Sequence, residues 1–182
     1  MSVVWHVTMS LDGFIAGPDD AMEWVFDYFS EEANETAGDV IETTGAIIMG
    51  RRTYEVEDRY RPGIYGGAWT GPYFVLTHEP PTTVPDWMTG TFITEEIEAA
   101  VARANQAAGG KNVGILGADL AKQCIERELL DEIIIHLAPV FLGDGVRLFA
   151  VSGGHRVPLE PTQVRRTGPL TDLRFRIGGG LK

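Results

Sequence analysis

The chain has 182 residues, of which 44% are hydrophobic and 23% are charged, so its composition is that of an ordinary globular protein and its length predicts one domain, 1–182. Its formal charge of −11 at pH 7 repels phosphate backbones and anionic lipids, so neither nucleic acid nor a membrane is an expected partner. The single cysteine, Cys124, excludes an intramolecular disulfide and a thiolate metal cluster, and it points to a reducing, cytoplasmic location.

The N-terminal half alternates segments typical of strands and of helices. Residues 3–9 are mostly β-branched or aromatic and predict a buried strand, which a turn at 11–13 follows. Apolar residues at helical spacing predict a helix over 22–42, with the acidic cluster before it as a cap. The segments after it are expected to be a strand at 46–49, a helix over 51–57, a loop at 60–71 and a strand at 73–77.

The C-terminal half starts with the same alternation and then has no further helices. We expect, in chain order, a strand at 91–93, a helix at 95–108, a strand at 113–116, a helix at 118–129 and strands at 131–142, 146–149, 157–166 and 173–177. The Gly-Asp-Gly sequence after residue 142 is typical of a hairpin. The alternation predicts a mostly parallel sheet with helices on its faces, and the tail predicts antiparallel strands at one edge.

Two junctions between a strand and a helix carry the clearest chemical signal. At Gly50-Arg51-Arg52-Thr53, a helix start offers unpaired N–H groups beside guanidinium and hydroxyl donors, which together suit a phosphate. Gly117-Ala118-Asp119 is a second, weaker junction, because glycine is common there for turn geometry alone. A dinucleotide lying across the carboxyl ends of the strands would span both junctions. The alternative is that the two arginines are merely solvated surface charges.

Other motifs that carry chemistry are absent from the sequence. It has no nucleophile elbow, no Walker-type phosphate loop, no GxGxxG fingerprint and no HExxH pair. The four histidines are scattered, so no metal site is predicted. His136 lies within an apolar strand and is interpreted as a packed or hydrogen-bonded core histidine.

Five motifs occur in order along most of the chain: SLDGFIA at 10–16, GRRTYE at 50–55, LTH at 76–78, GADL at 117–120 and PVFLGDG at 139–145. Together they resemble the dihydrofolate-reductase-like superfamily, and within it the reductase domain of the riboflavin-pathway deaminase-reductase. The resemblance implies one α/β domain with a mostly parallel twisted sheet flanked by helices, an antiparallel C-terminal hairpin and NADPH as the cofactor.

Motif matching also implies which residues bind that cofactor. They would line the nicotinamide, hold the phosphates at the two helix starts and contact the 2′-phosphate of the adenosine. These residues are Thr8, Ile15, Ala16, Gly50, Arg51, Arg52, Thr53, Leu76, Thr77, His78, Leu116, Gly117, Ala118, Asp119 and Leu120. The paired glycines of the family are replaced here by Leu116-Gly117, and plain core packing is the alternative for Ile15 and Ala16.

The substrate side departs from the folate reductases. The position of their catalytic carboxylate is occupied by Phe29, which leaves Asp27 as the candidate acid and substrate anchor, with a solvated surface charge as its alternative. Trp24 and Tyr54 are the candidate aromatic residues for stacking on a flat substrate, whereas Phe26 is assigned to the core.

The expected function is that of an NADPH-dependent reductase, which transfers hydride to a planar pterin-, pyrimidine- or flavin-like heterocycle. One alternative is an NADP(H)-binding protein without turnover, because the acid is replaced; another is the ribosylaminopyrimidine reductase of the riboflavin pathway. A homodimer is expected, because 133–142 and the C-terminal strands offer an edge for pairing and related reductase domains often dimerise.

Overall fold

The fold is known from a computed structural model, which describes residues 1–28, 30–60, 63–84, 88–154 and 156–178, with the backbone alone for 31–35. The strands are β1 (Val3–Ser10), β2 (Phe14–Ala16), β3 (Thr44–Gly50), β4 (Tyr73–Leu76), β5 (Thr91–Ile93), β6 (Asn112–Leu116), β7 (Glu132–Ala138), β8 (Val146–Arg147), β9 (Leu159–Thr167) and β10 (Leu170–Ile177). The helices are α1 (Glu23–Phe26), α2 (Glu31–Thr43), α3 (Arg51–Tyr60), α4 (Ile97–Ala107) and α5 (Ala118–Glu126), with short 3-10 helices η1 (Pro18–Asp20) and η2 (Ile64–Gly67).

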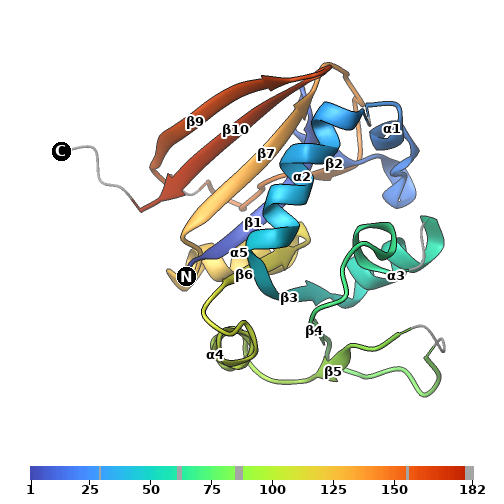
Figure 1. Cartoon of the computed structure of the whole chain (residues 1–182), viewed down its shortest axis with the longest axis vertical. Coiled ribbons are helices and arrows are strands. Elements are labelled where there is room, and N and C mark those ends of the chain that lie inside the picture. The colour runs from blue at the N-terminus through green and yellow to red at the C-terminus, as the bar shows by residue number, and fades with distance from the viewer. Residues whose placement is uncertain (29, 61–62, 85–87, 155, 179–182) are drawn as a thin grey trace.

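One eight-stranded sheet organises the chain, in the order β5-β4-β3-β6-β1-β7-β10-β9 (Figure 1). The five pairs from β5 to β1 and on to β7 are parallel, and β10 pairs antiparallel with both β7 and β9. The mostly parallel sheet and the antiparallel C-terminal hairpin are therefore confirmed. Within the described ranges, no helix has the length and apolar character needed to cross a bilayer.

Helices cover both faces of the sheet, which is why its central strands are apolar on both sides. In β3, Ile47, Ile48 and Met49 have no exposed surface. Ile48 belongs to the core under α4 and α5, whereas Ile47 and Met49 pack with Tyr54 of α3 in the opposite layer. Figure 1 shows α2 crossing the sheet, where its Val40 packs between β1 and β7.

The predicted helix over 22–42 is wrong in its continuity, because the chain forms α1 and α2 instead. The acidic residues before it, Asp19 and Asp20, form part of η1 with φ values of 55° and 61°, so they do not cap the helix. Phe29 lies between the two helices and outside the described residues.

The predicted strand over 131–142 ends early, at Ala138, because Pro139 has no N–H to continue the ladder. The Gly-Asp-Gly turn does not connect neighbouring strands. It leads into β8, which pairs with β2, a three-residue strand within a segment expected to be loop. A turn signal thus identified a reversal of the chain but not the partner strand.

The edge of the sheet is also not entirely where it was expected. β7 is an interior strand between β1 and β10, so its apolar residues serve the core. The edge strands are β5 and β9, and in β9 every residue but Thr167 is exposed.

Candidate active site

The sheet is open at the carboxyl end of its central strand β1. Val3, Val4, Trp5 and His6 are buried and the last residue, Ser10, is buried too, whereas residues 7–9 between them are partly exposed. A central strand with helices on both faces should be buried along its whole length, so this exposure marks an accessible region at the strand end. Ligands of open α/β sheets bind at such ends.

The predicted phosphate-binding residues converge beside this region. Gly50 at the end of β3 pairs in register with Leu76 of β4, and the preceding Met49 pairs with Leu116 of β6. Three of the predicted segments thus end side by side in the sheet. The fold brings them together because parallel strands place their carboxyl ends at one edge.

The starts of α3 and α5 lie against each other at this edge. A Cβ added to Gly117 would be 2.4 Å from Oγ1 of Thr53, and one added to Gly50 would be 3.2 Å from Leu120. Gly117 has a φ of 100° and supplies no side-chain cap to α5. The first N–H groups of α5 lack partners within the helix, so the junction offers donors at a place that only glycine fills without strain.

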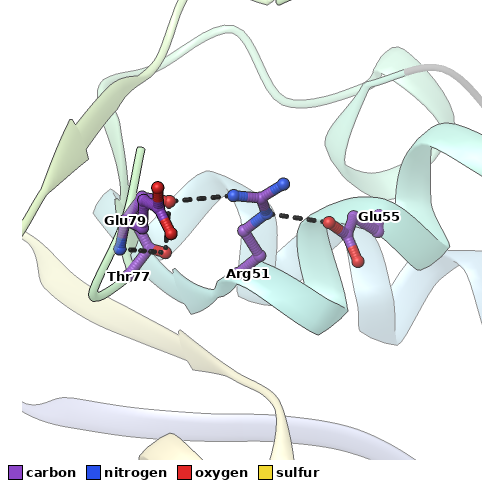
Figure 2. Close-up of polar contacts among 4 residues, drawn as sticks. All are labelled: Arg51, Glu55, Thr77 and Glu79. Carbon is purple, nitrogen blue, oxygen red and sulfur yellow. Dashed lines mark hydrogen bonds and ion pairs between the residues drawn. The ribbon is translucent and has the colours of Figure 1, made fainter. Parts of the chain in front are cut away.

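Arg51 links the start of α3 to the end of β4 (Figure 2). Its Nε donates to Glu55 at 2.8 Å, and one of its terminal nitrogens donates to the carbonyl oxygen of Glu79 at 2.8 Å. The hydroxyl of Thr77 donates to the same carbonyl at 3.1 Å, and it accepts from the Glu79 N–H at 3.3 Å. The predicted pair Arg51 and Thr77 is therefore assembled around one turn, while His78 next to them is exposed.

Arg52 points to the other side, where its Nε donates to Asp20 at 2.6 Å. This hydrogen bond, and then the charges of Asp20 and Asp119, raise the pKa of Arg52. The guanidinium is 70% exposed. Both arginines of the motif thus carry acidic partners at the surface.

Asp12 joins the first and last motifs of the chain. Its carboxylate accepts from the Ser10 hydroxyl at 2.6 Å and from the N–H groups of Leu142 and Gly143 at 3.1 and 2.7 Å. These donors, the Ser10 hydroxyl foremost, lower the pKa of Asp12. We call these hydrogen bonds from Ser10, Leu142 and Gly143 the Asp12 bracket. The predicted nicotinamide residues Ile15 and Ala16 follow in β2, which this bracket and the pairing with β8 hold in place.

These geometric features agree with a family model for the RibD C-terminal domain, which matches residues 1–171. The chain belongs to the RibD C-terminal domain family. The uncharacterized protein YwjB of Bacillus subtilis strain 168 is 34% identical over 152 residues, which are 80% of this chain and 81% of YwjB. The assignment confirms the expected family and the expected oxidoreductase class.

Solved structures show the same fold at low sequence identity. A Shewanella sp. PV-4 protein named for riboflavin biosynthesis has a TM-score of 0.81 and 20% identity, over 97% of this chain and 99% of its own. The diaminohydroxyphosphoribosylaminopyrimidine deaminase/5-amino-6-(5-phosphoribosylamino)uracil reductase of Thermotoga maritima has a TM-score of 0.70 and 12% identity. It matches 97% of this chain, which spans 56% of the Thermotoga chain.

The predicted substrate residues of this RibD-type domain lie apart from one another. Tyr54 is buried and its ring meets Phe92 edge-on at 5.4 Å. Trp24 packs against Ala138 and Leu170 in a separate small cluster. Asp27 is exposed at the C-terminal end of α1, so its proposed role as the acid stays a prediction.

A buried polar row that the sequence interpretation missed lies across β1, β7 and β10. Nε2 of His6 and Nε2 of His136 are 2.6 Å apart, and Nδ1 of His136 is 2.6 Å from Asp172. At the other end, Nδ1 of His6 is 2.9 Å from the hydroxyl of Tyr65. Among the described residues, no group of three or more His, Cys, Asp or Glu side chains is placed to hold a metal ion.

The electrostatics of this row follow from its burial. Burial, then the neighbouring His136, lower the pKa of His6 to about 3, so His6 is neutral at pH 7. The pKa of Asp172 is lowered despite burial, because His136 and Thr167 donate to its carboxylate. Burial raises the pKa of Glu57 to about 7, against the hydrogen bond that its carboxylate accepts from the backbone of Tyr65.

Proposed function

We propose that the chain is an NADPH-dependent reductase of a planar, pyrimidine-like heterocycle or its ribosyl derivative. The observation that carries the proposal is the contact between the starts of α3 and α5 at Thr53 and Gly117, beside the partly exposed residues 7–9 of β1. NADPH would supply the hydride when bound. Thr8 would face the nicotinamide, and the uracil reductase name of the Thermotoga relative supports the substrate class.

The residues present fit such a cofactor. The N–H groups at the start of α5 and the hydroxyl of Thr53 would hold the phosphates linking the two nucleosides, and Arg51 with Thr77 would hold the 2′-phosphate of the adenosine. Arg51 is 40% exposed in its ion pair with Glu55. Such a pair contributes about 0 to 1 kcal/mol, whereas hydrogen bonds to a charged group contribute about 1.5 to 3 kcal/mol, so phosphate would displace the carboxylate.

Calorimetric titration with NADPH and NADH tests the cofactor site. We expect Arg51→Ala and Thr53→Ala to weaken NADPH binding, by about 10- to 100-fold for Arg51→Ala, since one charge-assisted contact is lost. Loss of the 2′-phosphate contact alone would make the Arg51→Ala effect larger for NADPH than for NADH. Arg103→Ala is the matched control, because Arg103 of α4 forms an exposed ion pair with Glu95, away from the candidate site. Equal NADPH affinity for wild-type protein and both site variants would refute the cofactor site.

Turnover is tested by following NADPH oxidation with pterins, flavins and aminopyrimidines. Oxidation that depends on one of these heterocycles supports the reductase. Tight binding without such turnover would support the alternative, an NADP(H)-binding protein, which the exposure of Asp27 favours because an exposed carboxylate suits a solvated surface charge.

We also propose a homodimer in a reducing, cytoplasmic setting, where the buried free Cys124 stays a thiol. β9 is an edge strand that pairs with β10 on one side, and its Val164 is 67% exposed, which suits pairing of its other side with a second copy. Light scattering should give a molar mass of twice 19.9 kDa for the wild type and of 19.9 kDa for Val164→Lys, because a charge at this position disfavours pairing of the two edge strands. A wild-type monomer would refute the dimer.

A further inference from the structure

The row of Tyr65, His6, His136 and Asp172 is continuous, and each distance in it is that of a hydrogen bond. The separations are 2.9 Å, 2.6 Å and 2.6 Å along the row, and Thr167 donates to the second oxygen of Asp172 at 2.5 Å. His6 is 8% exposed and His136 4%. A buried polar network of this kind is destabilising unless every donor meets an acceptor, so its protons can be placed by counting.

When both histidines are neutral and Asp172 is a carboxylate, the row has one arrangement of protons. The Asp172 carboxylate accepts from Nδ1–H of His136, which leaves Nε2 of His136 as an acceptor. The facing Nε2 of His6 must then carry the proton, so Nδ1 of His6 accepts from the Tyr65 hydroxyl. In this state the phenol proton of Tyr65 is used inside the row.

One additional proton reverses the direction of the row. When His136 is an imidazolium, it donates from both nitrogens, and His6 carries its proton on Nδ1 instead. His6 then donates to the oxygen of Tyr65, and the O–H of Tyr65 is free to donate to a molecule outside the row. The two states differ by one proton and interconvert by proton shifts along existing hydrogen bonds.

The row reaches the candidate active site at two points. Thr8, the predicted nicotinamide residue, pairs in register with His136, which in turn pairs with Asp172, so the three side chains lie on one face of neighbouring strands. Tyr65 is partly exposed and packs against the cluster that contains Tyr54. Tyr65 is therefore the least buried member of the row, and its end of the row is the one that lies nearest to solvent.

We propose that Tyr65 is the catalytic acid of this reductase and that His6, His136 and Asp172 form the positioning relay that supplies its proton. The proposal rests on the proposed function, and it names a donor in place of the carboxylate that the folate reductases use. It also gives a role to three residues that are distant in sequence and buried together.

The step balances in atoms and electrons. NADPH, when bound, would supply a hydride, with its electron pair, to the carbon of a C=N bond, and the π pair of that bond would move to the nitrogen. The nitrogen forms its N–H bond with the proton of Tyr65. Tyr65 takes the Nδ1 proton of His6, His6 takes the Nε2 proton of His136, and His136 becomes neutral. Solvent returns one proton through Tyr65 after the product leaves.

The charges around the row favour this direction. Burial, then the neighbouring His136, oppose a charge on His6, and Arg174 opposes it further, whereas the carboxylate of Asp172 favours it. Asp172 lies 2.6 Å from Nδ1 of His136, at the end of the row away from Tyr65. Burial raises the pKa of Tyr65, and the nearby Glu57 raises it further, so a free phenolate is disfavoured. Tyr65 therefore releases its proton only as His6 replaces it. His136 and Thr167 donate to Asp172 and keep it a carboxylate.

Nitrogen-15 NMR of the histidine rings in the protein without cofactor tests the relay directly. At pH 8 we expect the proton of His136 on Nδ1 and that of His6 on Nε2. When the row has taken up one additional proton at lower pH, the proton of His6 should have moved to Nδ1. A His6 ring that keeps its proton on Nε2 after the row has gained that proton would overturn the proposal without reference to activity.

Single-turnover kinetics with NADPH and a substrate found in the screen provide the second test. Tyr65→Phe keeps the ring and should leave NADPH affinity unchanged, while it slows reduction about 100-fold and removes the solvent deuterium isotope effect. His136→Gln should slow the step similarly, provided that circular dichroism shows it folded. Tyr60→Phe is the matched control, since Tyr60 packs against Phe26 outside the row.

The outcomes separate the two proposals. Normal NADPH binding with an unchanged rate in Tyr65→Phe overturns the relay and leaves the reductase standing. Failure of the wild-type protein to bind NADPH overturns the reductase and, with it, the role of the relay. Slowed reduction in Tyr65→Phe with normal rates in Tyr60→Phe supports both.

Discussion

Replacing Gly117 with alanine is expected to destabilise the protein by about 1.5 to 4.5 kcal/mol. The backbone of Gly117 has φ of 100° and ψ of 141°, which a residue with a Cβ adopts at a cost of about 1 to 3 kcal/mol. The new Cβ would also lie 2.4 Å from Oγ1 of Thr53, so that side chain must leave its rotamer at about 0.5 to 1.5 kcal/mol. Urea unfolding followed by circular dichroism measures the sum.

Two further variants separate the causes. Gly109→Ala is the matched control: Gly109 has φ of 59° and no atom within 4 Å of an added Cβ, so only about 1 kcal/mol is expected. Adding Thr53→Ala to Gly117→Ala should recover the Thr53 part as a favourable coupling of about 0.5 to 1.5 kcal/mol. If Gly117→Ala cost no more than Gly109→Ala, or if the coupling were zero, the contact between α3 and α5 would not be as described.

Three other measurements follow from the electrostatics. Glu57 has a folded pKa of about 7, above its ordinary value of 4.5, because it is buried, so its contribution to stability is lost as pH rises from 4.5 to 7. In urea unfolding, Glu57→Gln should therefore stabilise the protein at pH 8 by roughly 1 to 3 kcal/mol and change little at pH 4.5. His6 has a folded pKa of about 3, below its ordinary value of 6.5. In the Glu57→Gln background, the free energy of unfolding should therefore decrease by up to about 1.4 kcal/mol for each pH unit as the pH is lowered from 6.5. Adding His6→Gln should flatten that slope. Asp12→Ala should speed hydrogen exchange at the N–H groups of Leu142 and Gly143, which lose their acceptor; unchanged exchange would contradict the bracket.

The parts of the fold that the sequence predicts are those whose signals are local. β3 and the start of α3 follow from an apolar run that ends at Gly50, and the junction at Gly117 follows from the same pattern. The break between α1 and α2 was missed, because helical spacing of apolar residues continues across it. β2 was missed because three residues carry too little periodicity, and its pairing with β8 is tertiary.

The candidate site also has a part that local sequence signals predict and a part that depends on tertiary structure. The cofactor residues belong to short motifs, so matching them to a family required no knowledge of the strand order. The polar row did require it: His6 and His136 are 130 residues apart, and only the adjacency of β1 and β7 makes them neighbours. His136 alone was correctly interpreted as a hydrogen-bonded core histidine, yet no pattern within its own strand shows the partner.

The bracket at Asp12 has a consequence for engineering this domain. One carboxylate fixes backbone groups 130 and 131 residues further along the chain, so the first loop and the loop after β7 have a single shared geometry. A chimera that exchanges either loop with a relative would inherit half of the arrangement. Swaps designed to alter substrate preference should therefore transplant 10–16 and 139–145 as a matched pair.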